Sequence, residues 1–169
     1  MQQLHHANTQ NNERKFPITL VCDAIRTPQN IGMIFRIAES FGVSKIYFHE
    51  SSPSVDNKTV KKVARSTIRE VKSETYSDFK ALIGQLKKEN TIIGIELTDE
   101  SINLPDFNFT QYQNIVLVLG SERHGIAETS ILDHCVQIEM YGKNSSMNVA
   151  NSLAITLYEV TQQILNLRS

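Results

Sequence analysis

Two polar loops bounded by glycine follow strand-like apolar runs in the last third of the chain. The run 114–119 is followed by the loop Gly120-Ser121-Glu122-Arg123-His124-Gly125. The run 135–140 leads through a second polar loop into Ser146-Met147-Asn148, where a long apolar-periodic segment begins. Ligands of open α/β sheets bind outside the carboxyl ends of strands, where loops vary without disturbing the core. The pattern therefore predicts a ligand site formed by these loops.

A third polar segment, 23–36, follows the apolar run 18–22. Asn30 is a candidate helix N-cap, and the free N–H groups of a helix N-terminus favour an anion. Gly32 would let a ligand or another chain approach the helix closely, and Arg36 follows about one turn later. Each segment, taken singly, also has an explanation without a ligand. The segment 23–36 can be a capped helix with a surface arginine, and 120–125 can be a plain strand-to-helix turn. In the third segment, Ser146 can be a helix N-cap and Asn148 can bond to the local backbone.

The elements that would position these segments alternate between strand and helix patterns. Strands are expected at 18–22, 45–49, 70–75, 91–97, 114–119 and 135–140, and helices at 30–41, 57–67, 77–88, near 127–132 and at 147–165. Gly42 is expected to end the first helix, and Ser77 or Asp78 to cap the helix at 77–88. This alternation predicts an α/β domain with a mostly parallel sheet and helices on both faces. Residues 1–15 are polar and without periodicity, so we expect a loosely ordered arm before a single domain at 16–169.

The composition excludes several classes of protein. The chain has 169 residues, of which 40% are hydrophobic and 21% charged, as in ordinary soluble domains. It contains no apolar stretch of membrane-spanning length, no secretory leader and no zinc-ligand spacing. Cys22 and Cys135 lie in apolar runs and are expected to be buried, reduced thiols. We therefore expect a cytoplasmic protein with neither a membrane nor a metal as partner.

The net charge of −1 gives no global signature of nucleic-acid binding, but basic residues gather in one segment. If the segment were one helix, most of these residues would share a face: Lys58, Lys61, Lys62, Arg65, Arg69 and Lys72. A stripe of this kind is either a solvated helix face or a surface that contacts nucleic-acid phosphates. The charge pattern alone leaves both interpretations open.

In order and spacing, the three polar segments resemble the signature motifs of the SpoU (TrmH-like) family, the RNA ribose 2′-O-methyltransferases of the SPOUT superfamily. The motif Asn-x-Gly-x-x-x-Arg is matched at Asn30, Gly32 and Arg36. The motif Gly-(Ser/Asn)-Glu-x-x-Gly is matched at 120–125. The third motif, Ile-Pro-Met-x-Gly before Ser-Leu-Asn-Val, resembles 138–149, with Glu139 in place of proline and Met147 in place of leucine. The resemblance covers residues 17–165.

The resemblance implies an α/β knot, in which the C-terminal segment threads a loop to form a deep trefoil knot. It also implies S-adenosylmethionine as cofactor, RNA as substrate and a homodimer whose site is assembled at the subunit interface. The apolar last helix is a candidate for that interface, although core packing explains its pattern equally well. Methionine in place of leucine nearly conserves volume. Glu139 removes the fixed φ of proline beside the expected cofactor strand.

The resemblance also assigns roles to individual residues. The expected catalytic residues are Asn30, Arg36, Glu122, Ser146 and Asn148. The expected cofactor-binding residues are Leu97, Gly120, Ile138, Ser146 and Met147. The basic segment would bind RNA through Lys58, Lys61, Lys62, Arg65 and Arg69. No residue is assigned to a metal.

The expected reaction is in-line transfer of a methyl group from a sulfonium to a ribose hydroxyl, which is a poor nucleophile. A guanidinium, with an ordinary pKa above about 12, is a poor base. The hypothesis is therefore that Arg36 stabilises the developing alkoxide and grips a neighbouring phosphate, while Glu122 and Asn30 orient it.

Two other functions fit the same motifs less well: a non-catalytic RNA- or cofactor-binding knotted protein and a tRNA base methyltransferase. Among RNA substrates, tRNA is preferred to rRNA, because a domain with no more than a polar arm beside it must find its target by shape and local contacts.

Overall fold

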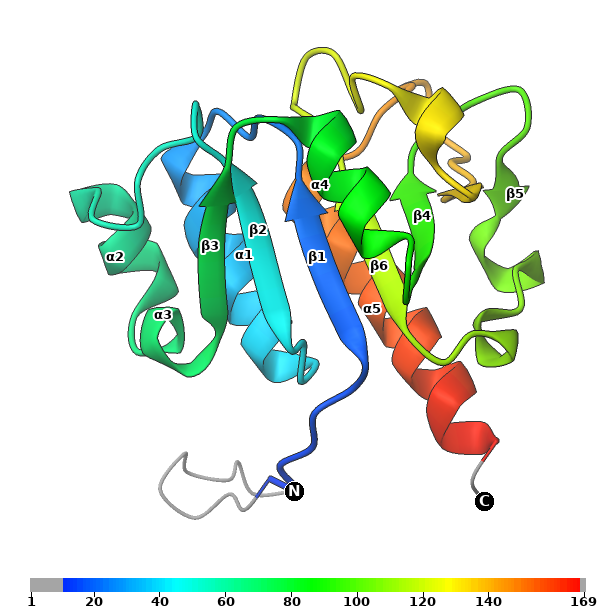
Figure 1. Ribbon diagram of the computed structural model, residues 1–169, viewed down its shortest axis with the longest axis horizontal. Coiled ribbons are helices and arrows are strands. Elements are labelled where there is room, and N and C mark those ends of the chain that lie inside the picture. The colour runs from blue at the N-terminus through cyan, green and yellow to red at the C-terminus, as the bar shows by residue number, and fades with distance from the viewer. Residues whose placement is uncertain (1–10, 168–169) are drawn as a thin grey trace.

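A seven-stranded parallel sheet organises the chain, with helices on both faces (Figure 1). The computed structural model describes residues 11–167. The strands are β1 (Ile18–Cys22), β2 (Lys45–His49), β3 (Lys72–Tyr76), β4 (Thr91–Ile95), β5 (Ile102–Asn103), β6 (Ile115–Leu119) and β7 (His134–Gln137). The helices are α1 (Pro28–Ser40), α2 (Lys58–Ala64), α3 (Thr67–Glu70), α4 (Phe79–Leu86) and α5 (Val149–Asn166). Single 3-10 turns lie at Leu104–Asp106, Phe109–Gln111 and Thr129–Ile131.

The order of the strands is β3-β2-β1-β6-β4-β7-β5, and every neighbouring pair is parallel. Strand β6 lies at the centre, between β1 and β4, and all five of its residues are buried. Because the strands are parallel, their carboxyl ends meet at one edge, where loops from distant parts of the chain are brought together. The predicted parallel α/β architecture is confirmed.

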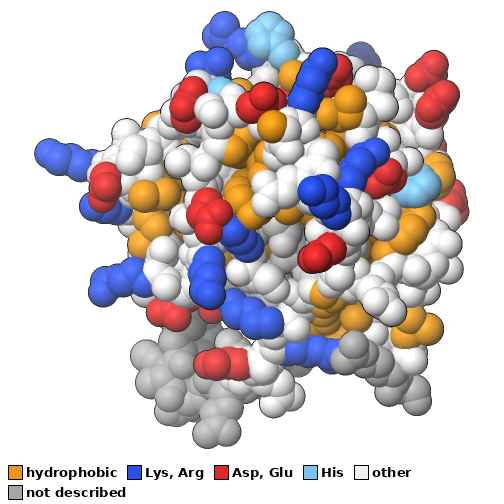
Figure 2. Space-filling view, viewed as in Figure 1, with side chains coloured by type: hydrophobic (Ala, Val, Ile, Leu, Met, Phe, Trp, Pro, Cys, Tyr) orange, Lys and Arg blue, Asp and Glu red, His pale blue; other side chains and the backbone are white. Residues whose placement is uncertain are grey.

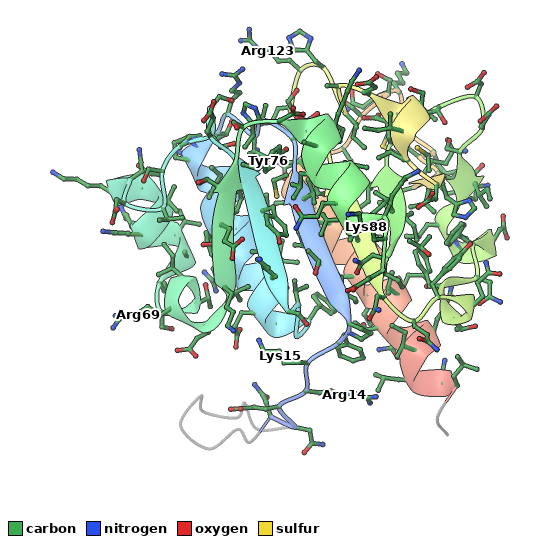
Figure 3. The ribbon with its side chains drawn as sticks, viewed as in Figure 1. Arg14, Lys15, Arg69, Tyr76, Lys88 and Arg123 are labelled. Atoms are coloured by element: carbon green, nitrogen blue, oxygen red, sulfur yellow. The ribbon has the colours of Figure 1, made fainter. Side chains whose placement is uncertain are left out.

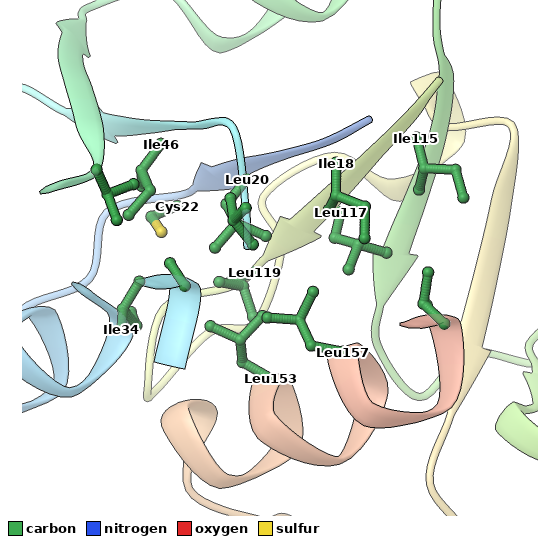
Figure 4. Packing of buried hydrophobic residues seen from close by; sticks show 14 of the residues in the cluster. Ile18, Leu20, Cys22, Ile34, Ile46, Ile115, Leu117, Leu119, Leu153 and Leu157 are labelled. Carbon is green, nitrogen blue, oxygen red and sulfur yellow. The ribbon is translucent and has the colours of Figure 1, made fainter. Parts of the chain in front are cut away.

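Two apolar layers enclose the sheet. On one face α1 and α5 pack side by side, and Leu117 and Leu119 of β6 join Leu153 and Leu157 of α5 in one cluster (Figure 4). On the other face α4 packs through Leu82 and Ile83 against a second cluster. A strand buried on both faces reads as a continuous apolar run, which explains the sequence pattern of β6.

The basic helix expected at 57–67 begins as predicted, with Asn57 as the N-cap of α2, but it ends at Ala64 because the backbone breaks at Arg65. This residue has φ of 56°, a left-handed conformation that ends α2, and the separate helix α3 begins at Thr67. Lys72 belongs to β3. The six basic residues therefore do not share one helix face.

Other boundaries differ by a few residues. Pro28 begins α1, as suits a residue whose missing N–H is not needed in the first turn. Gly42, with φ of 62°, follows the C-cap Phe41 as predicted, and Asp78 caps α4 as predicted. The short edge strand β5 lies between two predicted strands, 91–97 and 114–119, where the sequence predicted no strand. The arm predicted at 1–15 lies outside the described residues up to position 10.

Both cysteines are free thiols. Cys22 is buried and Cys135 is half-buried, so the expectation of burial is confirmed fully for Cys22 alone. Burial raises the pKa of both thiols. Between residues 11 and 167 no helix is long and apolar enough to cross a membrane, and no three His, Cys, Asp or Glu side chains are grouped as for a metal.

Gly32 sets the distance between α1 and α2. A Cβ added there would lie 2.6 Å from Val63 Cβ and 3.0 Å from the Val60 carbonyl oxygen. The close approach anticipated at this glycine is therefore made by a helix of the same chain.

Gly32→Ala is expected to destabilise the protein by about 1–3 kcal/mol through overpacking. Gly84→Ala in α4 is the matched control, since a Cβ there meets nothing within 4 Å. The control should gain up to about 1 kcal/mol from helix propensity. Urea unfolding of both variants measures the two changes, and equal midpoints would contradict the packing argument.

Candidate active site

A cavity of about 630 Å³ lies at the carboxyl ends of β4, β6 and β7. Its wall comes from the ends of these strands, from the loop 120–125 and from residues 145–149 at the entry to α5. The five residues predicted to bind the cofactor all line it: Leu97, Gly120, Ile138, Ser146 and Met147. Its volume falls within the range of small-molecule sites. The fold therefore brings all five of these residues, which are far apart in the sequence, to one cavity.

Glu122 joins the loop after β6 to the loop after β1. Its two carboxylate oxygens accept hydrogen bonds from the backbone N–H groups of Arg26, at 2.9 Å, and Thr27, at 3.0 Å. The Asn30 Nδ2 group donates a third bond to Glu122 Oε1 at 2.9 Å. Glu122 thus satisfies N–H groups at the start of α1 that have no partner within the helix.

Asn30 and Asn148 extend this connection to α5. Asn148 donates from Nδ2 to Asn30 Oδ1 at 3.0 Å, and its Oδ1 accepts from the N–H groups of Ala150 and Asn151. Asn30 itself is only 8% exposed. Three of the predicted catalytic residues, one from each motif, therefore form one hydrogen-bonded chain: Glu122, Asn30 and Asn148.

The helix caps differ from those predicted. Thr27, not Asn30, is the N-cap of α1, because Pro28 already occupies the first helical position. Asn148, not Ser146, is the N-cap of α5, and Ser146 lines the cavity instead. Asn30 is free to bond outside its helix because it lies in the first turn on the side that faces Glu122.

The charge of Glu122 is strongly favoured. Partial desolvation alone would raise the pKa of its carboxyl, but the hydrogen bonds from Arg26, Asn30 and Thr27 outweigh this effect and lower the pKa from 4.5 to about 2. Hydrogen bonds donated to a carboxylate stabilise its ionised form. Glu122 is therefore an anion at neutral pH and cannot act there as an acid.

The loop 120–125 closes on itself through its second and last residues. Ser121 and Gly125 exchange two backbone hydrogen bonds, of 2.9 and 3.1 Å. A Cβ at Gly120 would collide with the backbone of Gly125, and Gly125 has φ of 65°. Each glycine is thus required for a definite reason: one for close approach, the other for a left-handed conformation.

Two carboxylates that the sequence analysis missed hold the end of this loop. Asp23, directly after β1, accepts from the N–H of Ala127 at 2.8 Å, and Glu96, directly after β4, accepts from the N–H of Ile126 at 3.0 Å. Strands β1 and β4 flank β6, so the carboxylates grip adjacent amides from opposite sides. Their position at the carboxyl ends of buried strands was the signal that could have identified them.

Arg36 does not line the cavity. It is exposed on α1, and its side chain takes part in none of the hydrogen bonds or ion pairs found among residues 11–167. In the single chain, Glu122 and Asn30 bond to each other and to the backbone, not to this guanidinium. The contacts by which these two residues were predicted to orient Arg36 are therefore absent among residues 11–167.

The predicted RNA-binding residues lie on α2, α3 and the turn between them, and all are exposed: Lys58, Lys61, Lys62, Arg65 and Arg69. Basic side chains project at the left of the molecule, where these helices lie (Figure 2). Lys61 is paired with Asp56 at 2.6 Å. Arg123 projects beyond the carboxyl edge of the sheet, whereas Arg69 lies toward the opposite edge (Figure 3).

Comparison with known proteins gives a consistent family. Residues 17–158 match the model of the SpoU rRNA Methylase family. The chain is 30% identical over 168 residues to the 23S rRNA (guanosine-2′-O-)-methyltransferase RlmB of Neisseria meningitidis. This match covers 95% of this chain and 64% of the relative. It is 30% identical over 153 residues to the tRNA (guanosine(18)-2′-O)-methyltransferase of Saccharomyces cerevisiae, covering 86% of this chain and 10% of that relative.

The fold is likewise similar to solved structures. The SpoU methyltransferase AviRb from Streptomyces viridochromogenes, in complex with the cofactor AdoMet, superposes with a TM-score of 0.79 and 22% identity. The match covers 90% of this chain and 62% of AviRb. The chain thus spans less than two thirds of the length of each of these three proteins.

The pKa of Glu122 predicts a pH-dependent contribution to stability. Because the pKa is lower in the folded than in the unfolded state, the stabilisation is complete above about pH 5 and is lost as the pH falls from 4.5 toward 2. The difference in free energy of unfolding between wild type and Glu122→Gln should be constant from pH 7 to 5 and shrink below that range. Urea unfolding at several pH values measures it. A difference that stays constant down to pH 3 would contradict the assignment.

Proposed function

Because the chain belongs to the SpoU rRNA methylase family, we propose that it transfers a methyl group from S-adenosylmethionine to a ribose 2′-hydroxyl of RNA. One observation carries the proposal: the hydrogen-bonded chain of Glu122, Asn30 and Asn148 joins the three motif segments beside the cavity. The named relatives act on rRNA and on tRNA, and the proposal covers both classes. We favour tRNA, and we expect the reaction to take place in the cytoplasm.

The cavity has the chemistry that a nucleoside cofactor needs. Apolar side chains at the ends of β4 and β7 would face the adenine: Ile95, Leu97, Val136 and Ile138. Backbone groups near Gly120 and Met147 would hold the polar parts of the cofactor, and Ser146 adds a hydroxyl. When bound there, S-adenosylmethionine supplies the methyl group from its sulfonium. After the transfer, the demethylated cofactor is a neutral thioether and is the leaving group.

The protein side of the reaction is positioning and charge stabilisation. The ribose oxygen must lie in line with the methyl carbon while its proton leaves to solvent. A guanidinium near that oxygen stabilises the developing negative charge without accepting the proton. We assign this role to Arg36. Glu122, held as an anion, fixes the start of α1 and with it the helix that carries Arg36.

The exposed position of Arg36 is explained if the active molecule is a homodimer. Helices α1 and α5 lie side by side on one face of the sheet, and large apolar side chains are exposed on both: Met33 on α1, and Ile155 and Tyr158 on α5. Met33 and Arg36 are three residues apart and share a helix face. We propose that this face pairs with a second copy and that Arg36 then reaches the cavity of one subunit or the other.

The dimer predicts a linked loss of assembly and activity. Ile155→Glu with Tyr158→Glu should convert the dimer to a monomer, because two charges would be buried without partners, and methyl transfer should fall with it. Sedimentation velocity measures the mass. Lys88→Glu, a charge change on a residue outside α1 and α5, is the control and should leave a dimer. A wild-type monomer that transfers methyl groups would exclude this arrangement.

The reaction itself is tested by mass spectrometry of nucleosides. Unmodified tRNA and rRNA are incubated with S-adenosylmethionine and wild type, Arg36→Ala or Arg36→Lys. A 2′-O-methyl nucleoside is expected with wild type, none with Arg36→Ala, and at least about 100-fold slower formation with Arg36→Lys, which cannot reproduce the planar fork of the guanidinium.

The control in this experiment is cofactor affinity, measured by calorimetry, which should be unchanged in both variants. Normal turnover by Arg36→Lys would contradict the proposal that the guanidinium of Arg36 stabilises the developing negative charge. A methylated base in place of a methylated ribose would indicate a base methyltransferase, and failure of wild type to bind the cofactor would indicate a non-catalytic knotted protein.

We further propose that the basic segment of α2 and α3 contacts RNA phosphates. Gln substitutions at Lys61, Lys62 and Arg65 should weaken RNA binding and reduce the slope of log K against log salt by about 0.7–0.9 for each lost contact. The matched control replaces Lys80, Lys87 and Lys88, which carry the same total charge in and just after α4. If the slope of log K against log salt is the same in the two triple variants, the basic segment is an ordinary solvated surface and does not contact RNA.

A further inference from the structure

Tyr141 is the most exposed large apolar side chain among the described residues, at 91%. It lies on the loop between β7 and α5, next to Met140, which lines the cavity. The same loop continues into 145–148, which form another part of the cavity wall. The Tyr141 ring therefore belongs to a loop that forms part of the cavity wall, but the ring itself lies outside the cavity, at its rim.

A hydrogen bond restrains this exposed ring. The phenol of Tyr141 donates to Glu139 Oε2 at 2.9 Å. This bond and the carboxylate charge raise the pKa of Tyr141, so its hydroxyl remains a donor at neutral pH. Glu139 is also the position where the third motif has proline. The acid found there gives the loop a side-chain restraint, while the ring keeps its accessible surface.

A base of RNA is the partner that this ring fits. Proteins recognise particular nucleotides of RNA mostly in single-stranded loops, bulges and ends, where the bases are unstacked. Unstacked bases bind to exposed aromatic rings, whatever their sequence. Lys143, two residues further on, is also exposed and adds a positive charge beside the ring for the RNA backbone.

We propose that Tyr141 stacks on an unpaired base of the RNA substrate at the rim of the cavity. This inference rests on the proposed function, because it takes the cavity to receive a ribose of RNA. It extends that function by assigning a base-binding position on the β7–α5 loop, and it selects single-stranded or loop nucleotides as the substrate class.

Three variants separate stacking from other roles of this side chain. Tyr141→Phe keeps the ring and loses the bond to Glu139, Tyr141→Leu keeps apolar volume without a ring, and Tyr141→Ala removes both. The dissociation constant for fluorescently labelled tRNA and rRNA transcripts is measured by anisotropy, which does not require turnover. The affinity for S-adenosylmethionine is measured by calorimetry, and the oligomeric state by sedimentation.

Both Tyr141→Leu and Tyr141→Ala should bind RNA about 5- to 150-fold more weakly, with Tyr141→Phe within about twofold of wild type. For methyl transfer, the loss should appear in KM for RNA with kcat retained. Equal binding by wild type and Tyr141→Ala, or equal binding by the Leu and Phe variants, would overturn the proposal. A loss confined to cofactor affinity, or a change of oligomeric state, would also overturn it.

The outcome is separable from that of the proposed function. If wild type forms no 2′-O-methyl nucleoside but the ring-dependent RNA affinity is found, the proposed reaction fails and the stacking contact stands. If the nucleoside is formed and all three variants bind RNA as wild type does, the reaction stands and the contact fails.

Discussion

The arrangement of the site depends on one carboxylate that is surrounded by donors. Glu122 accepts from two backbone amides and from Asn30, and Asn30 accepts in turn from Asn148 at the N-terminus of α5. These contacts join residues that lie from 92 to 118 positions apart in the chain. Bonds to a charged acceptor are stronger than those between neutral groups. The starts of α1 and α5 are therefore held in a fixed relation to the loop after β6.

The strand order explains why carboxylates recur at this edge. A loop that leaves the central strand of a parallel sheet has neighbouring strands on both sides, and its amides need acceptors once they are removed from water. Asp23 and Glu96 supply these acceptors from β1 and β4. Glu122, which lies on the loop itself, is in turn the acceptor for the N–H of Thr27 at the start of α1. Exchange of acceptors between adjacent loops therefore fixes the cavity wall.

Local patterns in the sequence predicted much of the fold. Apolar runs located β1 and β6, helical spacing located α5, and Gly42 marked the end of α1. The five residues predicted to bind the cofactor line one cavity, because order along the chain and strand direction together determine which loops meet. Local pattern could not show the break at Arg65, since arginine is compatible with a helix and yet has φ of 56° here.

Long-range partners were beyond the reach of pattern for a different reason. Asn30 and Asn148 were both identified, but the bond between them depends on the relative placement of two helices that no local window contains. The caps were misassigned for a local reason, because Thr27 and Asn148 compete with neighbours of similar capping propensity. Arg36 was identified by its motif, whereas its exposure follows from the packing of α1 on the sheet.

The position of β6 also has a consequence for how the chain folds. β1 pairs with β2 early in the sequence, but its other edge stays open until β6, in the last third of the chain, has been made. Contacts between distant segments carry a loop-closure cost that local contacts avoid, and they form more slowly. During synthesis the first half can therefore assemble β1, β2 and β3 on α1, while Asn30 has neither of its two partners. Because the cavity wall includes residues 145–149, a ribosome must release the chain at least to the start of α5 before this edge of the sheet can be completed.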